Sequence, residues 1–150
     1  MTPRVRAFLP ALFFYAFAGV AGSNAAYAPN IPSNDYLNAL QAVDRFAWAW
    51  AHRDAAAGAK TVAPSLRKRL GPTALADYFV GTSSPQHWAF EIGSGRLVHA
   101  GTYRFPVRLY EYLYAGGGFV QVTSPQPVTV SKGPDGTWLI TTLPASKRVP

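Results

Sequence analysis

The stretch from Thr102 to Gly118, TYRFPVRLYEYLYAGGG, constrains the fold more than any other part of the sequence. From Tyr103 onward the odd positions are mostly apolar, whereas the even positions carry arginines, a proline and tyrosines. A period of two residues is typical of a strand with one buried face, so we predict a long strand here. Glu111 falls in the apolar row and three tyrosines stand in the polar row. Both departures from the pattern are candidate functional features.

The segments before this strand favour helices, and those after it favour strands. Three helices are expected, a long one and two shorter ones, within residues 35–54, 54–71 and 71–81, and Gly58 and Pro64 are expected to break the second into short pieces. About four strands are expected, within residues 87–95, 103–114, 119–130 and 137–144. In the first of them we expect Trp88, Phe90 and Ile92 to share one face, and we interpret His87 as a loop residue at its start. Short connections make the sheet antiparallel, and helices that precede strands indicate the α+β class.

Two patterns near the ends of this region are typical of one fold family. In the long helix Trp48 and Trp50 are followed by Asp54 and small residues, and near the C-terminus an Asp-Gly turn precedes Trp138 and alternating apolar residues. Over roughly residues 35–144 these patterns resemble the nuclear transport factor two-like superfamily of cystatin-like α+β cones, in its exported uncharacterised branch. The resemblance implies three N-terminal helices packed in the concave side of a curved antiparallel sheet. It also implies binding or assembly, because no polar pair matches that of the enzymatic branches.

The N-terminus has the composition of a secretory signal peptide. Arg4 and Arg6 precede an apolar run of 16 residues, and Ala26 and Ala28 follow as an Ala-x-Ala pair. Small residues in this arrangement fit the narrow subsites of a signal peptidase, so we expect cleavage after Ala28. The alternative is an uncleaved membrane anchor, although Pro10 weakens a helix here and a span needs about 20 apolar residues. We therefore expect an extracytoplasmic protein, either secreted or associated with the cell envelope.

The bounds that follow are a signal peptide at 1–28, a linker at 29–34, one α+β domain at 35–144 and a tail at 145–150. Removal of the two leader arginines leaves 12 basic against 7 acidic residues, a net charge of +5. Outside the cytoplasm this charge favours an envelope protein or an anionic wall polymer as partner, not nucleic acid. We expect membrane contact only through an uncleaved N-terminus. The basic triplet at 67–69 is interpreted as a solvated helix end.

The sequence indicates no cofactor and no metal site. The chain contains no cysteine, which excludes thiol catalysis and cysteine-ligated metals. The spacing of His52, His87 and His99 fits no metal-binding motif. Enzymatic activity is therefore not the leading interpretation.

Glu111 is the candidate catalytic residue. If the odd row faces the core, its carboxyl is desolvated, which favours the role of a general base or of an acid that reads a ligand. A β-bulge near Pro106 would instead turn Glu111 outward. A third interpretation pairs Glu111 with Arg96, Arg104 or Arg108, so that it only orders the sheet.

Arg108, Tyr110, Tyr112 and Tyr114 form the candidate binding face. Flat aromatic rings beside a cation suit sugar rings or a protein partner; the alternative is a sheet face that packs on a helix or needs no partner. The predicted function is an exported, non-catalytic binding or assembly module of the cell envelope, acting through the concave side or the tyrosine-rich face. Two alternatives remain: a small isomerase or cyclase with Glu111 as general base, and a structural subunit that dimerises through its sheet.

Overall fold

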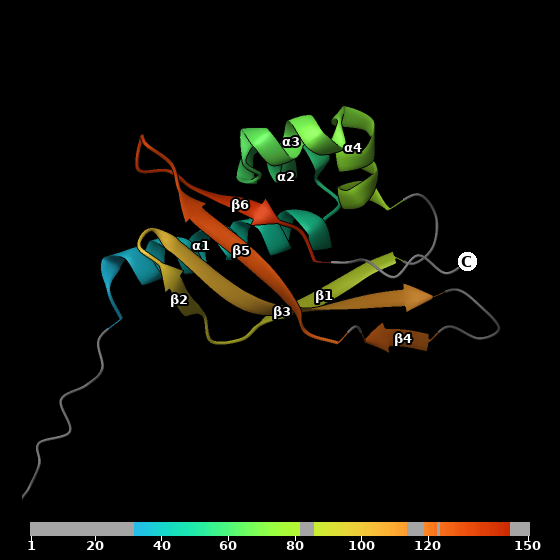
Figure 1. Cartoon of the computed structure of the whole chain (residues 1–150). Helices are drawn as coiled ribbons and strands as arrows, with labels where there is room; N and C mark the ends of the chain where they lie inside the picture. The colour runs from blue at the N-terminus through green and yellow to red at the C-terminus, as the bar shows by residue number, and fades with distance from the viewer. Residues whose placement is uncertain (1–31, 82–85, 114–118, 123, 145–150) are drawn as a thin grey trace, which may run out of the picture. The chain divides into compact units, whose positions relative to one another are not determined.

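A computed structural model of the chain describes residues 32–81, 86–113, 119–122 and 124–144 (Figure 1). The expected signal peptide, half of the linker, the tail and Tyr114 lie outside the described residues. Among the helices that the structure describes, none is long and apolar enough to cross a membrane.

Four helices form in the described region where three were expected. They are α1 (Asn34–Ala51), α2 (Ala55–Thr61), α3 (Pro64–Leu70) and α4 (Pro72–Val80). The second predicted helix is divided at Pro64, because proline cannot continue a helix but is well suited to its first turn.

The helix ends are set by side-chain caps and by glycine. Helix α1 is capped by Ser33, slightly earlier than its sequence suggested, and the Ser33 hydroxyl accepts a hydrogen bond from the N–H of Tyr36 at 3.1 Å. Asp54 caps α2 by accepting from the N–H of Ala57 at 2.8 Å. Helix α4 ends at Gly81, whose φ of 63° lies in the left-handed region that glycine adopts without strain.

Six strands of the described region form one antiparallel sheet, in which β3 is the central element. The first half of β3 lies between β2 and β5, and its second half lies between β1 and β4. The third predicted strand is divided into two around Pro125, because proline interrupts a ladder. The strands are β1 (Gln86–Ile92), β2 (Arg96–His99), β3 (Thr102–Leu113), β4 (Phe119–Val122), β5 (Gln126–Lys132) and β6 (Trp138–Thr142).

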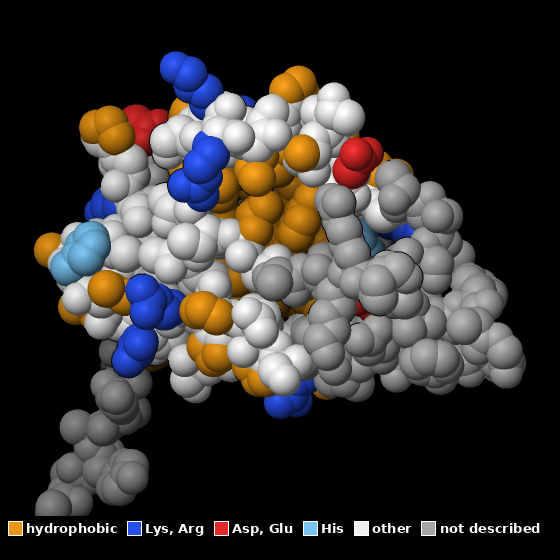
Figure 2. Space-filling model, turned by 45° about the vertical axis from the view of Figure 1, so that its right-hand side comes forward, with side chains coloured by type: hydrophobic (Ala, Val, Ile, Leu, Met, Phe, Trp, Pro, Cys, Tyr) orange, Lys and Arg blue, Asp and Glu red, His pale blue; other side chains and the backbone are white. Residues whose placement is uncertain are grey.

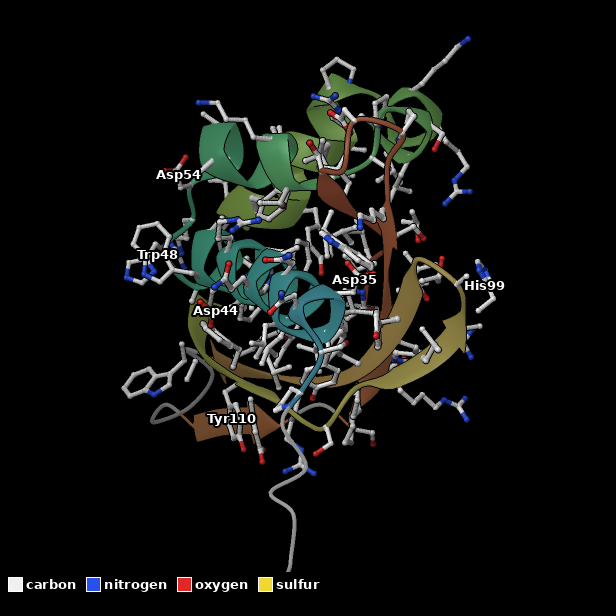
Figure 3. All side chains as sticks on the ribbon, turned by 90° about the vertical axis from the view of Figure 1, so that its left-hand side faces the viewer. Asp35, Asp44, Trp48, Asp54, His99 and Tyr110 are labelled. Atoms are coloured by element: carbon white, nitrogen blue, oxygen red, sulfur yellow. The ribbon has the colours of Figure 1, made fainter. Side chains whose placement is uncertain are left out.

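The core lies between α1 and the concave face of the sheet. The sheet curves around α1, and α2, α3 and α4 lie on the opposite side of α1 from β1 and β3 (Figures 1 and 3). One face of α1 and the predicted odd row of β3 are both buried. Val43, Phe46, Ala47 and Trp50 of α1 form one cluster with Phe105, Val107 and Leu109 of β3, and Glu111 is buried in the same row of β3. The α+β class and the curved antiparallel sheet around a long helix are confirmed.

A β-bulge in β1 changes which side chains face this core. His87 and Ala89 pair with consecutive residues of β3, so Trp88 is an extra residue between them. Trp88 is 62% exposed, whereas Phe90 and Ile92 pack against the core. The expectation that Trp88 shares their face is wrong, because one inserted residue reverses the alternation of side chains. His87 lies within β1, so the interpretation of His87 as a loop residue is wrong. Because of the bulge, it pairs with Glu111 of β3.

Candidate functional site

Three titratable side chains from three elements meet at one end of the core. Glu111 of β3 is fully buried on the inner face of the sheet, and His87 of β1 is its register partner. Tyr78 of α4 interacts electrostatically with Glu111. Burial raises the pKa of Tyr78, and the Glu111 charge raises this pKa further. We call Glu111, His87 and Tyr78 the inner cluster.

The structural explanations weighed for Glu111 find little support in this arrangement. Pairing of β3 with β5 around Pro106 is regular, so the alternative of a bulge that turns Glu111 outward is wrong. Arg108 bonds to Glu91 on the outer face at 2.9 Å, so its proposed pairing with Glu111 is wrong. Arg104 lies in the same even row as Arg108, and Arg96 is its register partner. The inner face therefore holds Glu111 away from these three arginines.

His87 is held in position by the last turn of α1. Its ring stacks on Trp50 with centroids 3.8 Å apart and an interplanar angle of 17°. Its Nδ1 lies 2.6 Å from the carbonyl oxygen of Trp50, which suits the tautomer with a proton on Nδ1. Burial lowers the pKa of His87 to about 4; the Trp50 carbonyl opposes this shift, and the charge of Arg53 adds to it. The imidazole is therefore neutral near pH 7.

The indole N–H of Trp50 completes this end of the core. It is buried, and within the described part of the chain it donates to no partner. A buried donor without a partner costs about 1–3 kcal/mol, so such a group is often completed by water or a ligand. The Glu111 carboxyl, the neutral imidazole of His87 and the indole N–H of Trp50 can together read a polar group or move a proton. The Tyr78 hydroxyl already donates to the carbonyl oxygen of Pro144 at 3.2 Å.

Comparisons with known proteins bear on the fold. No family model matches the chain, and no curated protein does either. A solved structure described as a ketosteroid isomerase-like protein from Erwinia carotovora atroseptica superposes with a TM-score of 0.54 at 17% sequence identity, covering 73% of this chain and 93% of that chain. This domain has the nuclear transport factor two-like cone fold. The inner cluster consequently lies on the concave side of the cone.

The outer face of the cone carries part of the predicted binding face. Tyr110 points away from α1 (Figure 3), and its hydroxyl donates to Glu91 at 3.2 Å. Arg108 bonds to the same carboxylate oxygen, so Glu91 joins the two predicted residues. A cleft of about 170 Å³ opens beside Glu91 and Arg108. The side chain of Tyr112, like the whole of Tyr114, lies outside what the structure describes.

On the face shown in Figure 2, the described Lys and Arg side chains do not gather into one patch. Figure 2 shows Lys and Arg side chains at separate places on the face in view, around an apolar area. The triplet Arg67, Lys68 and Arg69 forms the exposed last turn of α3, as expected for a solvated helix end. Among the described residues, no group of three or more His or acidic side chains is placed to hold a metal ion.

Sequence reasoning found Glu111 but missed its neighbours in the cone. His87 was missed because strict alternation puts it on the opposite face from Phe90. Tyr78 and Trp50 were expected within helices, with no reason to assign them to a site. One indication that Trp50 and Tyr78 could belong to a site was present in the sequence. Each lies in the last turn of its helix, where the chain leaves the core.

Proposed function

We propose that the protein is an exported, non-catalytic binding module of the cell envelope, whose ligand is recognised on the concave side of the cone. The observation that carries this proposal is the complete burial of Glu111 beside Tyr78 and His87. Desolvating a carboxylate costs several kcal/mol even where it is paired, and apolar replacements of buried ions are often neutral or stabilising. A contribution to folding is therefore a poor explanation for this acid, and recognition of a ligand is a better one.

The surrounding side chains indicate the kind of group that would be recognised. The carboxyl of Glu111 is an acceptor group, the indole N–H of Trp50 is a donor, and Leu109 and Phe79 are buried apolar side chains of the same core. This set suits one polar group on an apolar body. The envelope location is supported by the leader composition and by the net charge of +5 after its removal, which suits surroundings rich in anionic polymer.

The test replaces Glu111 in the exported protein and follows stability and binding separately. We expect Glu111→Gln and Glu111→Leu to reduce retention on isolated envelope material at least tenfold. Urea unfolding of both variants shows whether they are folded, so that a loss of retention can be separated from a loss of structure.

Val107→Ala is the matched control on the same strand and the same face. It should lower the free energy of unfolding by about 1–3 kcal/mol and leave retention unchanged, because it removes only packing. Wild-type retention by Glu111→Leu would show that the concave side does not carry the binding.

A second candidate is a proton-transfer enzyme of the isomerase or cyclase type, with Glu111 as general base. It is favoured by the electrostatic interaction between Glu111 and Tyr78, since a base and a donor are what such a reaction requires. The Tyr78 hydroxyl donates to the carbonyl oxygen of Pro144 at 3.2 Å, so it would have to leave this bond to act as the donor. The similar Erwinia protein is described as ketosteroid isomerase-like. Turnover of a ketosteroid that is abolished by Glu111→Gln and reduced by Tyr78→Phe would move the assignment to this enzyme.

A further inference from the structure

A groove of about 640 Å³ runs between α1, α2 and the start of β6, and it shares no lining residue with the inner cluster. Its volume is in the range of pockets that hold small organic ligands. Figure 3 shows Trp48 at the edge of this region, with Asp44 on one side and Asp54 on the other. Three kinds of side chain line the groove: the apolar side chains of Ala42, Ala57, Trp138 and Leu139, the acidic side chains of Asp44 and Asp54, and the basic side chains of Arg45 and Lys60.

Trp48 is an exposed aromatic platform at the groove. Its side chain is 49% exposed, although it belongs to a well-packed helix whose other face is buried. Its indole stacks on His52 with centroids 3.9 Å apart, and the Nδ1 of His52 lies 2.9 Å from the carbonyl oxygen of Trp48. This stack limits the freedom of the indole before any ligand arrives, so less side-chain entropy is lost on binding.

Both signs of charge stand around the same groove. Asp54 is oriented by its bond to the N–H of Ala57. The ion pairs seen among the described residues involve none of the four charged side chains that line the groove. A purely anionic or purely cationic ligand would approach two like charges. A ligand that carries an ammonium and a carboxylate complements both.

The groove is also lined by a residue with a buried hydrogen-bond donor, Trp138. Trp138 is 5% exposed, and its indole N–H has no hydrogen-bond partner in the part of the chain that the structure describes. A buried donor of this kind is completed by an acceptor such as a carboxylate or a peptide carbonyl. The aliphatic and aromatic surface around it suits an apolar side chain.

We propose that this groove is a second ligand site, which binds a short zwitterionic peptide. The ammonium of the peptide lies toward Asp54, its carboxylate toward Arg45 and Lys60, and its apolar side chain packs beside Trp48. This site is separate from the concave side of the cone and does not depend on the function proposed for it.

The test is titration of the full-length protein with the tripeptide Ala-Phe-Ala, followed by isothermal calorimetry and by tryptophan fluorescence. We expect saturable binding that weakens at least tenfold when the N-terminus is acetylated, and again at least tenfold when the C-terminus is amidated. Trp48→Ala and Lys60→Ala should each weaken binding of the uncapped peptide at least fivefold.

Two matched controls and one independent variant accompany these measurements. Trp88→Ala removes another exposed tryptophan, and Arg69→Ala removes another exposed cation; both should leave peptide affinity unchanged. Glu111→Gln should leave it unchanged as well. The proposal is overturned by no saturable binding, by equal affinity for free and capped peptides, or by loss of peptide binding in Glu111→Gln, which would place the peptide in the cone.

Discussion

The imidazole of His87 lies in surroundings that favour its neutral form. Carbonyl groups of Trp50 and Phe79 face it from α1 and α4, Arg53 lies in the turn after α1, and Glu111 is its partner on β3. The folded pKa of about 4 lies below the ordinary value of 6.5, so the unfolded chain takes up a proton first as the pH falls. His87 therefore contributes stability above pH 6.5 that is lost between about pH 6.5 and pH 4.

The size of this loss is about 2 kcal/mol, after allowance for the partial exposure of the ring. Urea unfolding of the wild type and of His87→Asn at pH 7.0, 5.5 and 4.5 measures it as the difference between the two pH dependences. We expect a shallower fall for His87→Asn and no change for His99→Asn, which alters an exposed imidazole. Parallel curves for wild type and His87→Asn would refute the assignment of a neutral, partly buried His87.

The position of Glu111 could be predicted from the sequence, whereas that of His87 could not. Alternation along β3 predicts that Glu111 shares the face of Leu109, because the whole strand keeps one period. His87 lies on the far side of a bulge, and a bulge here leaves no mark in composition, since Trp88 is as compatible with a buried position as with an exposed one. Its pairing with Glu111 depends on register between strands, which one strand's pattern does not contain.

Among the elements, α2 and α4 approach each other where Gly58 is buried. A Cβ at this position would overlap the ring of Phe79. Phe79 is fully buried, and its ring packs edge-on against the ring of Phe46 with centroids 5.6 Å apart. This packing restrains the Phe79 ring. The glycine is therefore required by close packing of two helices, although it lowers the intrinsic stability of α2.

Gly58→Ala separates these two effects. Helix propensity alone predicts a gain of about 1 kcal/mol, whereas overpacking in a rigid core costs about 1–3 kcal/mol or more. We expect a net loss, measured by urea unfolding, of about 1–2 kcal/mol. Ala56→Gly on the exposed side of α2 is the control and should lose about 1 kcal/mol from propensity alone. A more stable Gly58→Ala protein would mean that α4 yields to accommodate the methyl group.

The element pattern explains which strands could be predicted. Pro64 and Pro125 divide helix and strand at positions that the sequence displays, so the extra helix and the separation of β4 from β5 were within reach. Strand β2 was not, because all four of its residues are exposed and no apolar alternation marks it. A strand without a buried face gives no hydrophobic signal, and only its pairing with β3 defines it.

At the scale of the whole domain, closure of the sheet around α1 creates both candidate sites. The inner cluster joins residues 78, 87 and 111, and the groove joins α1 and α2 to the start of β6. The fold class follows from element order, and the resemblance supplied the cone. These sites require the relative placement of elements far apart in the chain, and composition and periodicity carry no information about that placement.

The same closure gives the sheet two faces with different energetics. The inner face is core, whereas the exposed Arg108–Glu91 pair with Tyr110 stands on the outer face, where ion pairs contribute little to stability. We expect Arg108→Ala to leave the urea unfolding curve and retention on envelope material unchanged, because we propose that the ligand binds on the concave side. Loss of retention would move the binding site to the outer face. A dimer by sedimentation that Arg108→Ala converts to a monomer would instead identify that face as a subunit contact.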